Sequence, residues 1–335
     1  MTSSSRASAH KRATILDVAA AAGVSRQTVT RAMNDMPGIS QATRERVQKL
    51  AREIGYTPSR FAKGLVQGAR TSIGLAIPDL TNPYFPAFAS SVVEMATRRG
   101  WNVVVDDYGH GTGRAVDAVE RLAPQVDAVI GYLDDDSGQA QALMGSRPVV
   151  LLDQPAGRAA GRITFDYSHA ARLALQYLAA DGRRHIAYLD SSQNSSLSAR
   201  GNAVADAAKG LGIHLLPART LASANEARPA VLELLEQSPE VDGLLAFNDL
   251  VAAGALKALA QANRSVPHDC AVIGMDGIPL GELVSPELTT LSLDLREVGR
   301  AAVELLEGLL SGTIDPGSPD AELVLRHELI VRESA

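Results

Sequence analysis

Apolar residues near the start of the chain recur at the spacing of a short helix that buries one face. The positions are Ile15, Val18, Ala19 and Ala22, which follow an i, i+3, i+4, i+7 pattern. Thr14 and Asp17 form a capping box before them, and Gly23 ends the run. The pattern predicts one amphipathic helix followed by a tight turn.

Two further helices are predicted directly after this turn. Ser25 is placed to cap the second, in which Val29 and Met33 point inward. Ser40 with Thr43 begins the third, whose buried positions are Val47, Leu50, Ala51 and Ile54, and Gly55 ends it. The outer face of the second helix is left to Arg26, Gln27, Thr30 and Arg31. Three short helices with a glycine turn between the first two are typical of a helix-turn-helix, whose second helix enters the DNA major groove.

From Ser72 onward the pattern changes to short apolar runs that alternate with longer helical stretches. The predicted strands are SIGLAIP, NVVVDDY, VDAVIGYL, RPVVLLD, HIAYLD, VDGLLAFN and CAVIGMD. Each run is followed by polar or glycine-rich turn residues. The alternation predicts an α/β fold with doubly wound parallel sheets behind an all-α head.

Charge divides the chain at the same place. Residues 1–71 hold twelve Lys and Arg against four acids, a net charge of +8, whereas the remainder holds 20 basic and 34 acidic residues, a net charge of −14. A basic head on an acidic body indicates that the head meets a polyanion. The alternative is a small helical bundle whose arginines are solvated.

Composition narrows the class of protein further. A chain of 335 residues with 46% apolar residues can bury more than one core. Cys270 is the single cysteine, which excludes an intrachain disulfide, and its apolar surroundings predict a buried reduced thiol. The opening MTSSSRASAHKRAT has no apolar stretch of signal-peptide length, so a cytoplasmic protein without membrane contact is expected.

Enzymatic motifs are absent from the sequence. No full G-x-G-x-x-G opens the first strand-to-helix turn, and DYGHGTGRA is interpreted as a glycine-rich loop. The acidic run 134–136 is interpreted as a solvated loop, and the histidines follow no metal-ligand spacing. We therefore expect no catalytic residues, no metal and no cofactor.

The motifs closely resemble the LacI/GalR family of transcriptional regulators. The likeness runs from Thr14 to Asn34 and through ISQATRERVQKLAREIGYTPSRFAKGL, IGLAIPDLTNPYF, VVLLDQP, LLAFNDLVAAGALKAL and CAVIGMDGIPL. It implies a two-lobed core similar to periplasmic binding proteins. The implied divisions are a disordered tail 1–13, a DNA-binding domain 14–57, a hinge 58–70 and an effector and dimerisation domain 71–335. The implied lobes are 71–164 with 294–322, and 165–293 with 323–335.

Candidate DNA contacts follow from side-chain chemistry and from this resemblance. Arg pairs with guanine and Gln with adenine, so Arg26 and Gln27 are the expected base readers. Hydroxyls near helix N-termini are suited to phosphates. The full candidate set is Thr14, Ser25, Arg26, Gln27, Thr28, Thr30, Arg31, Asn34, Ser40, Thr43, Tyr56, Ser59, Ala62 and Leu65.

The hinge is predicted to form a helix only when DNA orders it. Gly64 and Gly68 each cost a helix about 1 kcal/mol relative to Ala. The resemblance implies that Leu65 wedges into the minor groove at the operator centre. The alternative is a plain flexible linker, with Leu65 packed on the body.

Candidate effector contacts lie where strands of the predicted sheets end, since open α/β sheets bind ligands there. The set is Asn82, Tyr84, Phe85, Asp153, Phe165, Arg200, Asn202, Asn248 and Asp276. The family commonly places a second arginine two residues after Arg200, but this chain has Asn202. The missing positive charge predicts a neutral polyhydroxy effector, a sugar or polyol.

The expected function is therefore that of a regulator, most simply a repressor, which binds a pseudo-palindromic operator and is switched by a small carbohydrate. The chain ends at LVLRHELIVRESA without a terminal heptad helix, so a homodimer is expected. The alternative function is that of a solute-binding receptor with no DNA role.

Overall fold

The computed structural model describes residues 15–33, 37–54, 56, 70–109, 114–135, 137–154, 158–191 and 196–335. The predicted tail 1–13 and nearly all of the hinge 58–70 lie outside these ranges. The same holds for five candidate DNA contacts, which are Thr14, Asn34, Ser59, Ala62 and Leu65.

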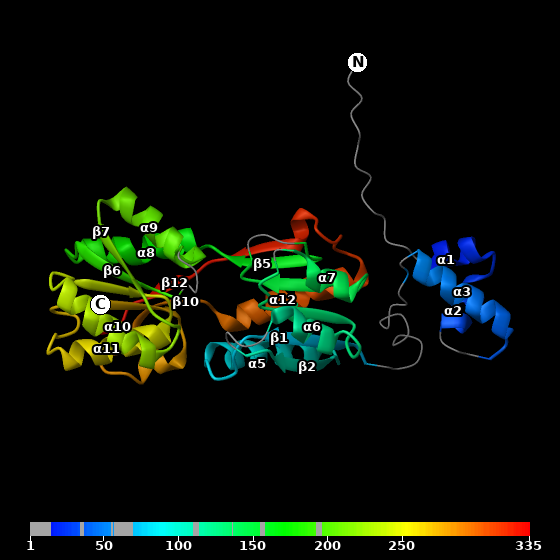
Figure 1. Cartoon of the computed structure of the whole chain (residues 1–335), viewed down its shortest axis with the longest axis horizontal. Helices are drawn as coiled ribbons and strands as arrows, with labels where there is room; N and C mark the ends of the chain where they lie inside the picture. Colours follow the sequence, from blue (N-terminus) through cyan, green and yellow to red (C-terminus); the bar gives the residue numbers. More distant parts are fainter. Residues whose placement is uncertain are drawn as a thin grey trace, which may run out of the picture. The chain divides into compact units, whose positions relative to one another are not determined.

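The head consists of α1 (Ile15–Ala22), α2 (Arg26–Met33) and α3 (Gln41–Glu53), drawn in blue in Figure 1. Gly23 makes the turn after α1 with a φ of +61°, a value that glycine adopts without strain. The core of the head is small and apolar. It consists of Val18, Ala22, Val29, Ala32, Val47 and Ala51. The predicted inward faces are thus confirmed, and Met33 packs at the edge of this core.

Two serine caps fix where the head helices begin. The Ser25 hydroxyl accepts the Thr28 amide proton at 3.1 Å, and the Ser40 hydroxyl accepts that of Thr43 at 3.2 Å. Such caps typically stabilise a helix by about 1 kcal/mol. Gln48 on α3 donates to the Ala32 carbonyl at 2.9 Å, which ties α3 to the end of α2.

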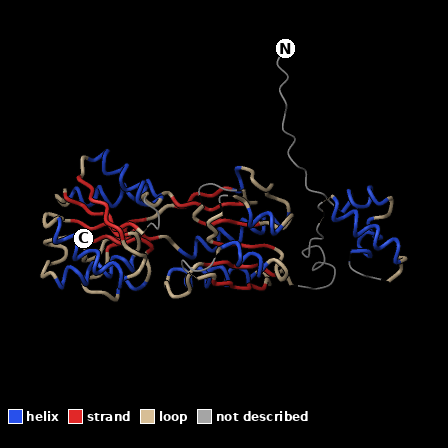
Figure 2. The backbone as a smooth tube through the Cα atoms, viewed as in Figure 1, coloured by secondary structure: helices blue, strands red, loops and turns tan. Residues whose placement is uncertain are grey.

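The body contains two six-stranded sheets, drawn as red segments in Figure 2. The order is β2-β1-β3-β4-β5-β11 in one sheet and β7-β6-β8-β9-β10-β12 in the other, so both follow the same doubly wound order. The first sheet consists of β1 (Ser72–Ile77), β2 (Asn102–Asp107), β3 (Ala128–Gly131), β4 (Val149–Leu152), β5 (Gly161–Phe165) and β11 (Glu322–Leu325). The second consists of β6 (His185–Asp190), β7 (His214–Arg219), β8 (Gly243–Ala246), β9 (Ala271–Asp276), β10 (Thr289–Ser292) and β12 (Glu328–Ile330).

Helices connect the strands along the chain. They are α5 (Tyr84–Arg98), α6 (Ala115–Leu122), α7 (Gln139–Met144), α8 (Tyr167–Ala180), α9 (Ala199–Leu211), α10 (Ala224–Gln237), α11 (Asp249–Gln261) and α12 (Leu295–Ser311), with short 3₁₀ turns at Pro279–Glu282 and Pro319–Ala321. β1 pairs in parallel with β2 and β3, and β6 with β7 and β8. The predicted fold class is confirmed.

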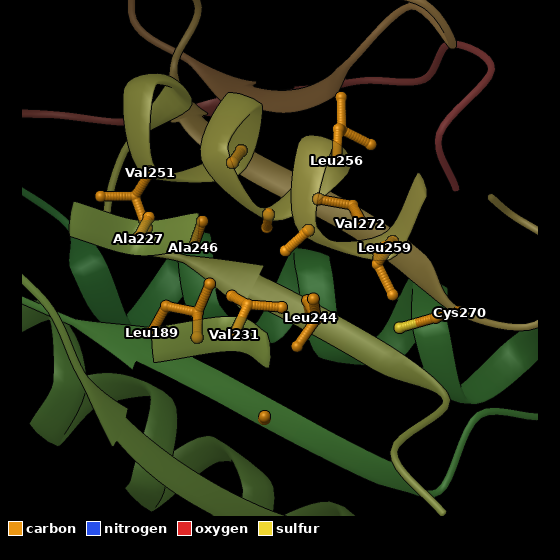
Figure 3. Close-up of a cluster of buried hydrophobic side chains, with 14 of the residues drawn as sticks. Leu189, Ala227, Val231, Leu244, Ala246, Val251, Leu256, Leu259, Cys270 and Val272 are labelled. Atoms are coloured by element: carbon orange, nitrogen blue, oxygen red, sulfur yellow. The ribbon is translucent and has the colours of Figure 1, made fainter. Parts of the chain in front are cut away.

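Strand alternation in the second sheet separates two apolar cores. Leu189, Leu244 and Val272 project to the face covered by α10 and α11, where they pack with Cys270 (Figure 3). Their neighbours Tyr188, Leu245 and Ile273 project to the face covered by α8 and α9. Cys270 is a free, buried cysteine, as predicted, and burial raises the pKa of its thiol to about 12.

Some elements were not predicted from the sequence. β5 and β10 are strands of only five and four residues, too brief for a pattern to stand out, and β7 is a six-residue edge strand that is largely exposed or half-buried. The interpretation of 134–136 as a solvated loop is wrong for Asp135, which is buried. Its carboxylate accepts the amide protons of Gln139 and Ala140 and so begins α7.

Two compact units emerge from the packing of the chain. The first is Met1–Pro78, Ala96–Arg162 and Glu304–Ala321, and the second is Asp79–Met95, Ile163–Val303 and Glu322–Ala335. The second unit thus includes most of α5 and the start of α12, which approach so closely that a Cβ at Gly299 would lie 2.0 Å from the Ser91 Oγ. The lobe boundaries drawn from the sequence stay a prediction.

Among the described residues, no helix combines the length and the apolar composition that a membrane crossing needs. Within the same ranges, no group of three or more His, Cys, Asp or Glu side chains is arranged to hold a metal ion.

Candidate functional site

One edge of the second sheet brings together polar residues from three strand ends, among them the candidate effector residues Asn248 and Asp276. β6, β8 and β9 are neighbouring parallel strands, so their carboxyl ends meet at one edge. Asp190 and Asp276 end β6 and β9, and Asn248 follows β8. All three side chains are buried.

Arg200 lies at the centre of this group. Its guanidinium donates to the Phe247 carbonyl at 2.8 Å and to Asp276 Oδ1 at 3.3 Å. The same guanidinium stacks on two rings, with its carbon 4.6 Å from the Phe247 centroid and 5.2 Å from the Tyr167 centroid. The positive charge of Arg200 is therefore matched by Asp276, and its flat faces are covered by aromatic carbon.

The start of α9 holds Arg200 in this position. Ser198 caps the helix by accepting the Gly201 amide proton at 3.0 Å. Asp190, at the end of β6, in turn accepts the Ser198 amide proton at 2.9 Å and its hydroxyl proton. A Cβ at Gly201 would lie 3.1 Å from the Tyr188 ring, so glycine allows the helix to approach β6. Together these contacts place Arg200 in the first turn of a helix that is docked on β6.

Asn248 and Asp276 have different local roles. Asn248 is the N-cap of α11, and its side-chain oxygen accepts the Val251 amide proton at 2.9 Å. The cap therefore engages the side-chain oxygen of Asn248. Asp276 has a φ of +116°, which side-chain-bearing residues rarely adopt, and only 5% of it is exposed.

Aromatic side chains adjoin the Arg200 group. The Phe165 and Tyr167 rings are 6.3 Å apart, and His327 lies 6.1 Å from the first and 5.8 Å from the second. His327 is 1% exposed. Burial, and then the charge of Arg200, lower its pKa from 6.5 to about 3, so His327 is neutral at physiological pH.

This neutral histidine makes acid stability a measurable property of the cluster. The unfolded His327 takes up a proton near pH 6.5 and the folded one only near pH 3, so stability is lost as the pH falls between these values. Over that window the loss approaches about 1.4 kcal/mol per pH unit. Urea unfolding at pH 7, 6 and 5 should show a shallower decline in His327→Phe, which keeps the ring and removes the titration. If the free energy of unfolding fell equally with pH in both proteins, a lowered pKa of the buried His327 would be contradicted.

The remaining effector candidates lie elsewhere. Asn82 accepts the Tyr84 amide proton at 3.1 Å at the start of α5, where the Tyr84 and Phe85 rings meet edge to face at 5.2 Å. Asn202 is exposed on α9 and donates to the Leu197 carbonyl at 3.2 Å. Asp153 follows β4 in the first compact unit with a φ of +57°.

On the head, α2 presents the predicted base readers to solvent. Arg26 and Gln27 are exposed at its first turn, whereas Arg31 is half-buried beside Gly38. The Thr30 hydroxyl donates to the Arg26 carbonyl at 3.1 Å, and Thr28 lies 2.9 Å from the Ser25 hydroxyl. Burial raises the pKa of Tyr56, which the charge of Arg26 partly offsets. Ser25, Ser40 and Thr43 take part in the helix caps described above.

Several residues that lie around Arg200 were not among the candidates predicted from the sequence. They are Tyr167, Asp190, Ser198, Phe247 and His327. Ser198 stands directly before helix α9, so the sequence itself indicates it as a helix N-cap. The others meet only through the tertiary fold, so no short-range spacing could have grouped them.

Comparison with known proteins agrees with this division into head and body. Residues 14–59 match the model for bacterial regulatory proteins of the lacI family, and residues 175–335 match a periplasmic binding protein-like domain. The chain is also 30% identical to the ribose operon repressor of Halalkalibacterium halodurans over 307 residues, covering 88% of this chain and 89% of that protein. The chain belongs to the LacI family.

Solved structures of LacI-family proteins are similar over most of the chain. A LacI family transcriptional regulator from Arthrobacter sp. FB24 is 60% identical, with a TM-score of 0.78 over 80% of this chain and 99% of that one. The same regulator has been solved in complex with lactose, with a TM-score of 0.77 over 80% and 100% of the two chains. A lac repressor dimer bound to operator is 27% identical, with a TM-score of 0.71 over 97% and 99%.

Membership in the LacI family decides between the two functions that the sequence left open. This chain is a sequence-specific DNA-binding transcriptional regulator whose activity responds to a small molecule, and it is not an enzyme. A solute-binding receptor without a DNA role is excluded, because the lacI-family match covers the helix-turn-helix itself.

Proposed function

We propose that this regulator is a cytoplasmic, homodimeric repressor that releases a pseudo-palindromic operator when it binds lactose or a closely related neutral galactoside. The observation that carries the proposal is the 60% identity to a regulator solved with lactose, across 80% of this chain. At this identity, a binding site is expected to keep most of its residues. The dimer follows the lac repressor, which is a dimer on its operator.

The electrostatics of the Arg200 group support a neutral ligand. An anionic sugar needs an uncompensated positive charge, but the Arg200 guanidinium already faces Asp276 at 3.3 Å. Asp276 adds a carboxylate, which suits sugar hydroxyl donors, and Asn248 adds an amide. The rings of Phe165, Tyr167 and Phe247 suit the apolar faces of a sugar.

The remaining candidate contacts extend this proposal. The head comprises residues 14–57. Within it, Arg26 and Gln27 read bases while nearby hydroxyls bind phosphates, and the exposure of Arg26 and Gln27 supports this role. Residues 58–70 act as the hinge, and 71–335 as the effector and dimerisation domain. Asn82, Tyr84, Phe85, Asp153 and Asn202 stay candidate effector contacts.

Calorimetry on the full chain tests the choice of effector. Lactose should bind with a single class of sites, one for each protomer, whereas glucose 6-phosphate and glucuronate should bind at least tenfold more weakly. Preferential binding of either anion would refute a neutral-sugar effector and would leave the DNA-binding function unaffected.

A further inference from the structure

The turn after β9 is held in a strained conformation. Asp276 has a φ of +116°, and Gly277 follows with a φ of +72°. Strain of this kind persists only where the surroundings fix the backbone. The residue that bears it, Asp276, is the one that faces Arg200.

Asp249, the first residue of α11, supplies contacts that fix this turn. Its side chain is completely buried. Oδ2 accepts the Ile278 amide proton at 2.8 Å, Oδ1 accepts the Thr290 hydroxyl proton at 2.6 Å, and the Gly277 amide also donates to this carboxylate. One carboxylate thus joins α11, β10 and the turn that follows Asp276.

Two glycines keep space for this arrangement. A Cβ at Gly274 would lie 2.2 Å from Asp249 Oδ1, and one at Gly277 would lie 2.1 Å from the Ser292 hydroxyl. Larger residues at either position would displace the carboxylate or the turn. Capping does not explain Asp249, because Asn248 already caps α11.

We propose that Asp249 is a positioning residue for the effector site: its buried carboxylate fixes the turn at 277–278 and thereby aims the Asp276 carboxylate toward Arg200 and the effector. The part of this inference that concerns the effector rests on the proposed function. The part that concerns the turn rests on the contacts of Asp249 alone.

The energetics of Asp249 support a role other than stability. Burial, and then the charge of Asp276, raise its pKa from 3.8 to about 7. A buried carboxylate close to a second one disfavours folding, and an apolar residue would avoid that cost. The hydrogen bond from Ile278 to Asp249 gives a reason for a carboxylate at this position, because it fixes the turn that follows Asp276.

Asp249→Asn tests the proposal, because the amide keeps the shape and removes the charge and one acceptor. Hydrogen exchange of the Gly277 and Ile278 amides should become at least tenfold faster. Lactose affinity should fall about tenfold in the otherwise unchanged protein, but by less than twofold further in an Asp276→Asn background. Thr290→Val should also speed amide exchange at 277–278 and weaken lactose binding, each by less than Asp249→Asn does. Thr290→Ser keeps the hydroxyl, so its exchange rates and lactose affinity should match those of the unmodified protein.

The matched control is Asp269→Asn, an exposed aspartate that accepts from Ser265 in the same compact unit. Unchanged exchange at 277–278 in both Asp249→Asn and Thr290→Val would overturn the proposal, and so would equal losses of lactose affinity in the two backgrounds. If the unmodified protein bound no lactose, the sugar proposal would fail, and the exchange rates would still decide the role of Asp249.

Discussion

Replacing Asp276 by Asn should weaken lactose binding by about 10- to 100-fold. The substitution removes a charged acceptor, and hydrogen bonds to charged groups contribute about 1.5–3 kcal/mol each. It also leaves the guanidinium of Arg200, whose side chain is only 15% exposed, without its carboxylate. Asn tolerates an unusual positive φ better than most residues, so the backbone of the turn should be retained. Calorimetry with lactose measures the loss directly.

The control for this experiment is Asp269→Asn, which removes a negative charge from the surface of the same compact unit. Its lactose affinity should stay within twofold of the unmodified protein. If Asp276→Asn also stayed within twofold, Asp276 would not be an effector contact.

Replacing Gln27 by Ala should cost ~1–3 kcal/mol on the preferred DNA site and almost nothing on random DNA. The reason is that Gln27 is exposed on the first turn of α2 and carries no charge, so its contribution should be to base recognition. Anisotropy titrations on both DNAs at one fixed salt concentration measure the difference.

Gln237→Ala is the matched control for the Gln27 experiment. Gln237 ends α10 in the second compact unit, where it donates to Glu233 at 3.0 Å. Its removal should leave both affinities unchanged. An equal loss on preferred and random DNA in Gln27→Ala would instead make Gln27 a phosphate contact.

The local signals in the sequence predicted the head well. Apolar spacing and the serine caps depend on residues three or four apart, and Val18, Val29 and Val47 are all buried as expected. The longer strands were also predictable, because runs such as CAVIGMD are buried on both faces.

The site was only partly predictable. Strand ends identified Asn248 and Asp276, but the partner of Arg200 depends on how α9 docks on β6 through Asp190 and Ser198. Asp135 was misjudged because three successive acids favour a solvated loop, whereas helix α7 uses one of them as a buried anchor. The sequence marked Asp249 only as a polar residue at a strand end; its contacts could not be predicted because its partners, Ile278 and Thr290, are 29 and 41 residues away.

The most direct measurement of the central claim is the effect of lactose on DNA binding by the full chain. A fluorescent DNA site that the protein itself has selected from a random pool can be followed by anisotropy during a lactose titration. The account predicts that saturating lactose weakens DNA binding at least tenfold, and that glucose 6-phosphate at the same concentration leaves it unchanged. If the protein selected a DNA site but bound it equally tightly with and without lactose, the account would be contradicted.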